Sequence, residues 1–149
     1  MVLLENIIAI SGSGSLFKLI TTRANGLILE EIGTEKRNFY ASRNTQFSPL
    51  ESIGIYTLSD NIPLSEVYHR FVKIEDQNTI PTVTSSDADI RAFFENNVQE
   101  YDRYRVHIKD MKKCIKWYHF LAKYNLLVVK PEVNKEKKIQ ESEETDETK

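Results

Sequence analysis

The chain is poor in the residues on which several kinds of protein chemistry depend, since its 149 residues include one cysteine, three histidines, five glycines and four prolines. The single thiol, Cys114, cannot form an intramolecular disulfide, which favours a reducing compartment. No stretch approaches the ~20 consecutive apolar residues of a membrane span, and the apolar opening of the chain lacks the positive residues of a signal peptide. We therefore expect a folded cytoplasmic protein with no membrane association.

Side chains that bind transition metals are too few and too widely spaced to predict a metal site. The soft or borderline donors are Cys114, His69, His107 and His119, and no two of them have the short spacing of a zinc knuckle. Cys114 and His119 lie five positions apart, which on a helix turns them about 140° away from each other. We expect a buried free thiol, no metal and no cofactor.

The serine- and glycine-rich run Ser11–Ser15 does not match a nucleotide-binding motif. A P-loop needs a lysine and a hydroxyl directly after its last glycine, and a dinucleotide loop needs a third glycine that opens a helix. Here the residues that follow, 16–18, open a strand. We interpret the run as a flexible turn. Because no nucleophile, base and charge-stabilising group can be assembled elsewhere, we predict that the protein is not an enzyme and has no small-molecule substrate.

Residues 15–57 show the pattern of short antiparallel strands separated by turns. The sequence Ala-Asn-Gly at 24–26 is typical of a tight hairpin, because these residues tolerate positive φ. Pro49 is predicted to be the first residue of a single helical turn, and residues 54–58 are predicted to form the final strand. Strands in this order indicate a small SH3-like antiparallel β-barrel over residues 1–59.

From Pro63 onward the apolar residues recur at helical spacing, and a three-helix domain is predicted over residues 60–127. The predicted helices cover residues 63–76, 86–98 and 109–124. Ser86 is expected to cap the second helix, because its hydroxyl can accept a hydrogen bond from the Asp89 amide. The apolar positions expected to face the core are Leu64, Val67, Tyr68, Phe71, Ile74, Ile90, Phe93, Phe94, Val98, Met111, Ile115, Tyr118, Leu121 and Ala122. Together with the barrel, these helices give an α+β fold class.

The remaining residues, 128–149, have no aromatic side chain and are dominated by charge. From Glu132 onward they carry seven acidic and four basic residues. Such a composition cannot bury enough apolar surface to order the backbone, so we predict a disordered charged tail. An acidic tail can fold over a basic surface and compete with nucleic acid for it.

Residues 101–127 combine basic side chains with aromatic ones, and seven basic residues against two acidic ones give this stretch a net charge of +5 in a chain whose net charge is −2. The candidate nucleic-acid-binding residues are Arg103, Arg105, Lys109, Lys112, Lys113, Lys116, Lys123 and Trp117. On this interpretation the lysines neutralise phosphates of RNA or DNA, and exposed rings among Tyr104, Trp117 and Phe120 stack on unpaired bases.

Two other interpretations of the same stretch remain open. The lysines can be the ordinary solvated face of a helix whose aromatic residues pack inward. In the other interpretation the protein is an interaction or self-association module, in which an apolar groove binds a protein partner or a second copy of the chain. A basic stretch alone does not decide between these alternatives.

Four segments, IIAISGSGSLFKLI, PLESIGIYT, SSDADIRAFF and YDRYRVHIKDMKKCIKWYHFL, resemble a family of small uncharacterised Bacteroidetes proteins. The resemblance covers about residues 3–127. It implies an N-terminal domain of unknown function followed by a helical C-terminal domain of unknown function, and it implies no activity or catalytic residue. The chain departs from the pattern at Lys109, where a serine is expected before Asp110, and this weakens the predicted start of the last helix.

Overall fold

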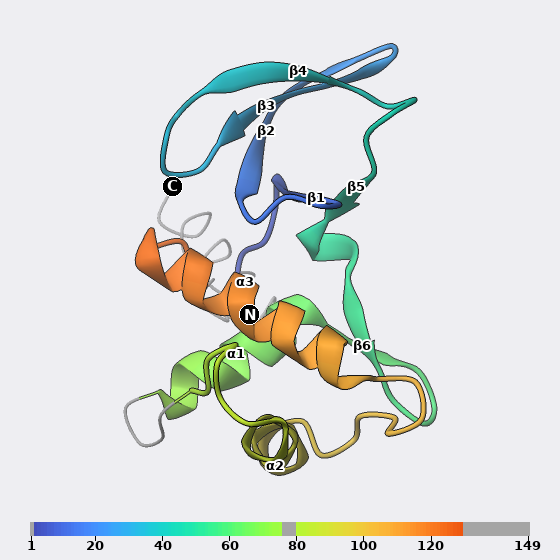
Figure 1. Ribbon diagram of the computed structural model, residues 1–149, viewed down its shortest axis with the longest axis vertical. Coiled ribbons are helices and arrows are strands. Elements are labelled where there is room, and N and C mark those ends of the chain that lie inside the picture. The colour runs from blue at the N-terminus through green and yellow to red at the C-terminus, as the bar shows by residue number, and fades with distance from the viewer. Residues whose placement is uncertain (1, 76–79, 130–149) are drawn as a thin grey trace, which may run out of the picture.

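The computed structural model describes residues 2–75 and 80–129 and shows an antiparallel sheet at one end of the molecule and helices at the other (Figure 1). The elements in chain order are β1 (Ile7–Ile10), β2 (Leu16–Arg23), β3 (Gly26–Glu31), β4 (Arg37–Ala41), β5 (Phe47–Pro49), the 3-10 turn η1 (Leu50–Ser52), β6 (Gly54–Tyr56), β7 (Asn61–Pro63), α1 (Leu64–Ile74), α2 (Asp87–Asn97) and α3 (Ile108–Lys123). The predicted α+β class is confirmed. The predicted tail falls on residues 130–149 for most of its length, which lie outside the described part of the chain.

The sheet has five strands in the order β4-β3-β2-β1-β5, and every neighbouring pair is antiparallel. The hairpin between β2 and β3 turns where the sequence predicts it, with Arg23 opposite Gly26. A Cβ atom at Gly26 would collide with the Tyr40 carbonyl, so only glycine lets β4 pass this closely. In the described residues β4 and β5 are the open edges of the sheet, and the predicted SH3-like barrel is not confirmed.

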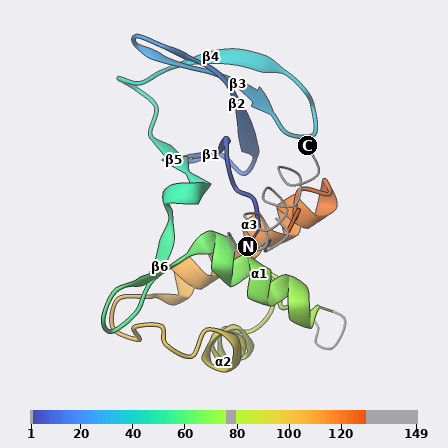
Figure 2. The same ribbon diagram turned by 180° about the vertical axis from the view of Figure 1, so that it is seen from behind.

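The sheet remains open because the strand at residues 54–56 does not join it. β6 pairs with β7 in a separate two-stranded hairpin, which leads directly into α1 (Figure 2). The sheet contains instead two strands that the sequence does not reveal, β1 and β5. β1 lies in the interior of the sheet between β2 and β5, and its first three residues, Ile7, Ile8 and Ala9, are all buried.

The three predicted helices are all present, and their ends are fixed by local chemistry. The Ser86 hydroxyl accepts a hydrogen bond of 3.1 Å from the Asp89 amide, as predicted for the start of α2. α3 begins after His107, whose backbone N–H donates to the Asp110 carboxylate at 3.0 Å. Asp110 therefore caps the helix from its third position, and Lys109 at the position where a serine is expected does not prevent capping.

One main core joins the helices to the inner side of the sheet. Phe71 of α1 is central to it, with ring centroids 4.9 Å from Phe93 and 5.4 Å from Tyr118. The Tyr68 hydroxyl donates a 2.7 Å hydrogen bond to the Cys114 carbonyl and so links α1 to α3. The predicted core residues of the helices are buried, except Ile74 and Ala122, which are partly buried. The helical spacing of apolar residues in the sequence therefore predicted which side chains of the helices face the core.

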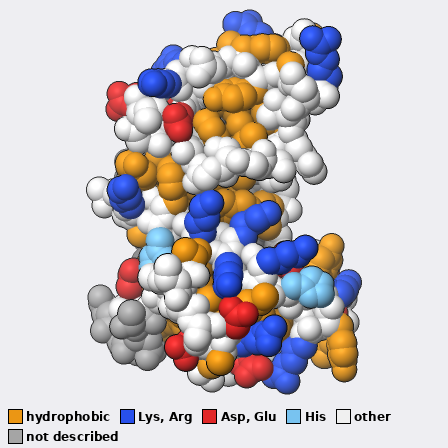
Figure 3. All heavy atoms as spheres, in the orientation of Figure 1, with side chains coloured by type: hydrophobic (Ala, Val, Ile, Leu, Met, Phe, Trp, Pro, Cys, Tyr) orange, Lys and Arg blue, Asp and Glu red, His pale blue; other side chains and the backbone are white. Residues whose placement is uncertain are grey.

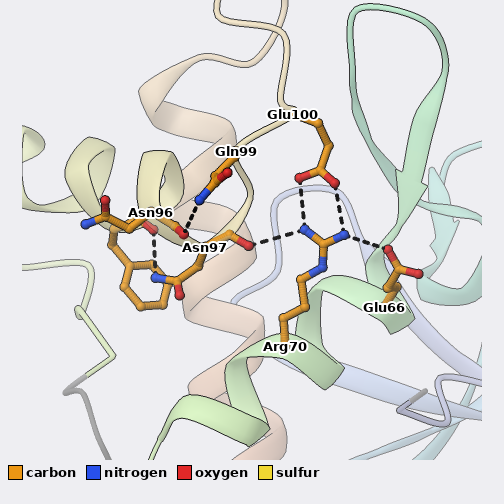
Figure 4. A network of polar contacts seen from close by, with 7 residues as sticks. Glu66, Arg70, Asn96, Asn97, Gln99 and Glu100 are labelled. Atoms are coloured by element: carbon orange, nitrogen blue, oxygen red, sulfur yellow. Dashed lines mark hydrogen bonds and ion pairs between the residues drawn. The ribbon is translucent and has the colours of Figure 1, made fainter.

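An arginine on α1 fixes the loop that leaves α2 (Figure 4). The Arg70 guanidinium makes two parallel hydrogen bonds to the Glu100 carboxylate, at 2.9 and 3.0 Å, and a third to Glu66 at 2.9 Å. It also donates to the Asn97 carbonyl at 3.3 Å. Because the pairing with Glu100 is bidentate, it sets the orientation of the loop that leads to α3.

Candidate nucleic-acid interface

α3 presents its lysines on one side, and we call Lys109, Lys112, Lys113, Lys116 and Lys123 the lysine ridge. At about 100° per residue the five positions fall within an arc of about 100°, opposite the buried residues of the helix. The helix crosses the middle of the molecule, between the sheet and α2 (Figure 1), and Lys and Arg side chains gather over it (Figure 3). Hydrophobic side chains lie between these cations and the sheet (Figure 3).

One member of the lysine ridge is neutralised. The Lys112 ammonium lies 3.1 Å from the Asp87 carboxylate in the first turn of α2. The other four lysines are exposed and form no ion pair with an acidic side chain in the described part of the chain. Two of them lie over aromatic rings: the Lys113 ammonium is 5.8 Å from the Trp117 ring centre, and the Lys123 ammonium is 5.4 Å from that of Tyr124.

Arg105 is held by the loop before α3. Its guanidinium is 2.7 Å from the Asp102 carboxylate and 2.8 Å from the Thr57 carbonyl, and it lies 4.5 Å above the Tyr56 ring centre. Asp102 is buried, and its pKa lies below the ordinary value because the Arg105 guanidinium and the Tyr104 backbone N–H both donate to the carboxylate. Arg105 is therefore a fixed cation stacked on a half-exposed aromatic ring.

The second candidate arginine, Arg103, is exposed and weakly paired. Its guanidinium is 3.8 Å from the Glu95 carboxylate and 6.0 Å from the Tyr101 ring centre. Both the distance and the exposure make this pair a minor electrostatic contribution. Arg103 and Arg105 extend the positive surface beyond the N-terminal end of the lysine ridge.

The three aromatic residues that the sequence suggests for base stacking differ in their exposure. Tyr104 is 87% exposed, whereas Trp117 and Phe120 are partly buried against the core. Phe120 also packs on Tyr124, with 5.0 Å between ring centroids. Tyr56, which is 51% exposed beneath Arg105, is an aromatic platform that the sequence does not indicate. No pattern in the sequence connects it to α3, because the contact depends on tertiary folding.

A groove runs along α3 and consists of two adjoining hollows, of about 270 Å³ and about 190 Å³. Both are lined by Ser48, Lys113 and Trp117. The larger hollow extends to Tyr56 and Arg105, and the smaller one extends to the turn 11–13 and Lys116. The groove thus brings two lysines, one arginine and the side chains of Tyr56 and Trp117 to one concave surface, which Phe94 and Asp110 also line.

The described residues contain no arrangement that indicates a metal site or a reactive thiol. Within 2–75 and 80–129, no three His, Cys, Asp or Glu side chains are placed to hold a metal ion. Cys114 is buried, and desolvation raises the pKa of its thiol to about 12. None of the helices in the described part combines the length and the apolar character needed to cross a bilayer.

Comparisons with known proteins assign both halves of the chain to domain families. Residues 4–50 match a domain of unknown function (DUF5606), and residues 53–121 match a second domain of unknown function (DUF6852). A structural genomics target from Bacteroides vulgatus, solved by solution NMR, is 32% identical and has a TM-score of 0.68; the match covers 89% of this chain and 96% of that one. A search of curated proteins gave no significant match.

Proposed function

We propose a function for this chain, which belongs to the Bacteroidetes family that joins the DUF5606 and DUF6852 domains. It is a cytoplasmic, non-enzymatic protein that binds single-stranded RNA or DNA along the lysine ridge. The phosphates lie on the lysines, and unpaired bases lie on the aromatic rings of the groove. This assigns roles to α3 and the loop before it.

The observation that carries the proposal is that four lysines of the ridge form no ion pair with an acidic side chain in the described part of the chain. A lysine face that is only solvated commonly forms ion pairs with acidic residues along the same or neighbouring helices. Here Lys109, Lys113, Lys116 and Lys123 keep their charge unpaired among the described residues, in a chain that is acidic overall. Concentrating free cations on one side of an acidic protein favours an anionic partner.

The aromatic groups favour a single strand over a duplex. Proteins that bind single strands combine a basic groove with rings on which the bases stack, and stacking contributes ~1–3 kcal/mol per base. Trp117 lines the groove on α3, and Tyr56 lines its far end. Paired bases of a duplex are stacked on each other and do not offer their faces to such rings.

Charge reversal on the lysine ridge tests the proposal. The ridge variant carries Lys109→Glu, Lys113→Glu and Lys116→Glu. It leaves Lys112 in place, because this residue pairs with Asp87 and its loss would disturb α2. The control variant makes the same change of charge with Arg23→Glu, Arg43→Glu and Lys73→Glu, at exposed positions on the sheet hairpin, the loop after β4 and α1.

At low salt the wild-type protein and the control are expected to bind a fluorescent single-stranded oligonucleotide, measured by anisotropy, and the ridge variant is expected to lose this binding. Engagement of four phosphates predicts that log K falls with log salt concentration with a slope of about −3, since each contact on a single strand contributes ~0.7. Equal binding by the ridge variant and the wild type would show that the proposal is wrong.

A second candidate, a protein interaction or self-association module, rests on an exposed surface that adjoins the far end of the groove at Tyr56. The β6–β7 hairpin and the loop before α3 expose Tyr56 (51%), Leu58 (79%) and Tyr104 (87%). Contiguous exposed apolar side chains are typical of protein interfaces. Size-exclusion chromatography with light scattering tests self-association through this surface: a dimer that Leu58→Ser converts to a monomer supports it, and a wild-type monomer at all concentrations contradicts it.

A further inference from the structure

The smaller hollow of the groove, which we call the turn–helix crevice, has a composition suited to an anion. Its lining residues are Ala9, Ile10, Ser11, Gly12, Ser13, Gln46, Ser48, Lys113, Lys116 and Trp117. Two are cationic, four carry hydroxyl or amide groups and none is acidic. The larger hollow, by contrast, contains the carboxylate of Asp110.

α3 and the turn between β1 and β2 face each other across this crevice. The Lys116 ammonium lies 3.6 Å from the position that a Cβ atom at Gly14 would occupy, so this lysine extends to the turn. At Gly12, whose φ is +87°, a Cβ atom would meet nothing within 4 Å, so the backbone there borders open space. A side chain at Gly14 would therefore contact the Lys116 ammonium group.

Hydrogen bonds hold the turn in one conformation. The Ser11 N–H donates to the Gln46 carbonyl at 3.1 Å, and the Ser13 N–H donates to the Ile10 carbonyl at 3.0 Å. The Ser13 hydroxyl accepts from the Ser15 N–H at 3.2 Å. Residues 11–13 of the run predicted as a flexible turn thus form one wall of the crevice.

Size limits what the crevice can accept. Pockets for drug-sized ligands or cofactors have volumes of ~300–1,000 Å³. A volume of about 190 Å³ is below that range. It suits a phosphate group, whose oxygens accept hydrogen bonds from ammonium and hydroxyl groups. Trp117 lines both hollows, so a base attached to that phosphate meets an aromatic face beside the crevice.

We propose that the turn–helix crevice binds the phosphate group of one nucleotide between Lys113, Lys116 and the serine hydroxyls of the turn, with the base against Trp117. The inference rests on the proposed function, because the nucleotide is part of a bound single strand. A free nucleoside monophosphate offers the same chemistry, and the test distinguishes the two sources.

The chain has one tryptophan, so its fluorescence reports directly on the crevice. The full-length protein is titrated in parallel with inorganic phosphate, thymidine 5′-monophosphate and oligothymidylate. Lys116→Gln removes a cation from the crevice, and the matched control Lys73→Gln removes one from the last turn of α1, outside the lysine ridge and the groove. Both lysines are exposed, and circular dichroism verifies that both variants fold.

The monophosphate is expected to quench the tryptophan, and inorganic phosphate is expected to compete with it. Lys116→Gln should weaken monophosphate binding roughly tenfold, because a charge-assisted hydrogen bond is lost, while Lys73→Gln leaves it unchanged. The oligonucleotide should quench the same tryptophan and bind more tightly, because it also engages the other lysines of the ridge.

Each alternative outcome has a separate meaning. Oligonucleotide binding without quenching of the tryptophan overturns the crevice site and leaves the lysine ridge as the interface. Monophosphate binding that depends on Lys116, without any oligonucleotide binding, supports the crevice as a site for free nucleotides and contradicts the proposed function. The absence of all binding rejects both proposals.

Discussion

The Lys112 ammonium and the Asp87 carboxylate lie 3.1 Å apart and connect the middle of α3 to the first turn of α2. This ion pair distinguishes Lys112 from its neighbours on the lysine ridge. Lys113, one position further along the helix, lines both hollows of the groove instead. Two adjacent lysines therefore have different surroundings, and single substitutions can test their expected contributions to stability and to binding separately.

We predict that Lys112→Gln lowers the free energy of unfolding by ~0.2–1 kcal/mol, the usual contribution of a partly exposed ion pair, and leaves oligonucleotide affinity nearly unchanged. Lys113→Gln should instead leave the free energy of unfolding unchanged and weaken oligonucleotide binding. It should reduce the magnitude of the slope of log K against log salt concentration by ~0.7. Urea denaturation and anisotropy titrations at several salt concentrations measure both quantities. Equal losses of affinity in the two variants would contradict the assignment.

The Asp102 carboxylate gives a prediction about pH. Its folded-state pKa lies below the ordinary value, because Arg105 and the Tyr104 N–H donate to the ionised form. The stabilisation is therefore complete above the unfolded pKa of about 3.9 and is lost as the pH falls through the folded value. Asp102→Asn should lower Tm at pH 7, and the difference in Tm between variant and wild type should close below about pH 4. A difference in Tm that is constant across this range would show that packing, not charge, is what the substitution removes.

Cys114 is predicted to be inert in the folded protein. Its thiol is buried, and the desolvation that raises its pKa to about 12 leaves almost no thiolate at pH 8. An aromatic disulfide reagent should react only as fast as the protein opens, and should react with one equivalent in denaturant. As a control, Cys114→Ala combined with Lys109→Cys places a thiol on the exposed lysine ridge, where reaction should be immediate. Rapid reaction of native wild-type protein would mean that the core around α3 opens readily.

The acidic C-terminal run, residues 141–149, lies outside the described residues, but its composition predicts an effect on binding. It carries five acidic residues and one basic residue. If it competes for the lysine ridge, a chain that ends at Gln140 should bind oligonucleotide more tightly at low salt, and the gain should vanish at high salt as the charges are screened. Replacing the five acids by their amides should give the same gain. Unchanged affinity in both variants would show that the run does not compete.

The helical half of the fold was predictable because amphipathic period, capping and burial agree there. Leu64, Val67, Tyr68 and Phe71 recur at helical spacing and are all buried. The hydroxyl of Ser86 caps α2 in the predicted way. Each of these features is local in sequence, so tertiary structure is not needed to detect it.

The strands β1 and β5 could not be predicted for different physical reasons. β1 is a continuous apolar run of four residues without alternation, because both of its faces are buried: Ile7 and Ala9 belong to the main core, and Ile8 belongs to a second, smaller cluster. Such a run does not distinguish strand from helix. β5 is three residues long and ends in Pro49, which lacks the N–H that a central strand needs, and it occupies an edge of the sheet. The expected barrel did not include these two strands and required the strand at residues 54–58 to join the sheet, whereas β6 pairs with β7.

For the candidate site, the spacing of the lysines in the sequence predicted that they share one face of the last helix. It did not predict which residues the basic side chains contact. The pairing of Lys112 with Asp87 and the stacking of Arg105 on Tyr56 join residues that are 25 and 49 positions apart in the chain. The turn at Ser11–Ser13 lies opposite Lys116 only after folding. Contacts at such separations depend on the whole topology, which no local pattern encodes.

The two ends of the described chain lie together. Val2, which is 2% exposed, forms a β-bridge with Val129, and the Leu3 N–H donates to the Val128 carbonyl at 2.9 Å. A peptide of a few residues is therefore long enough to join the ends covalently, and the exposed hairpin at Leu58 offers a place to reopen the ring. A circular permutant made in this way keeps α3 in one piece and places its new termini beside Tyr56, at one end of the groove, whereas a bulky tag fused directly to Val2 would displace a side chain from the core.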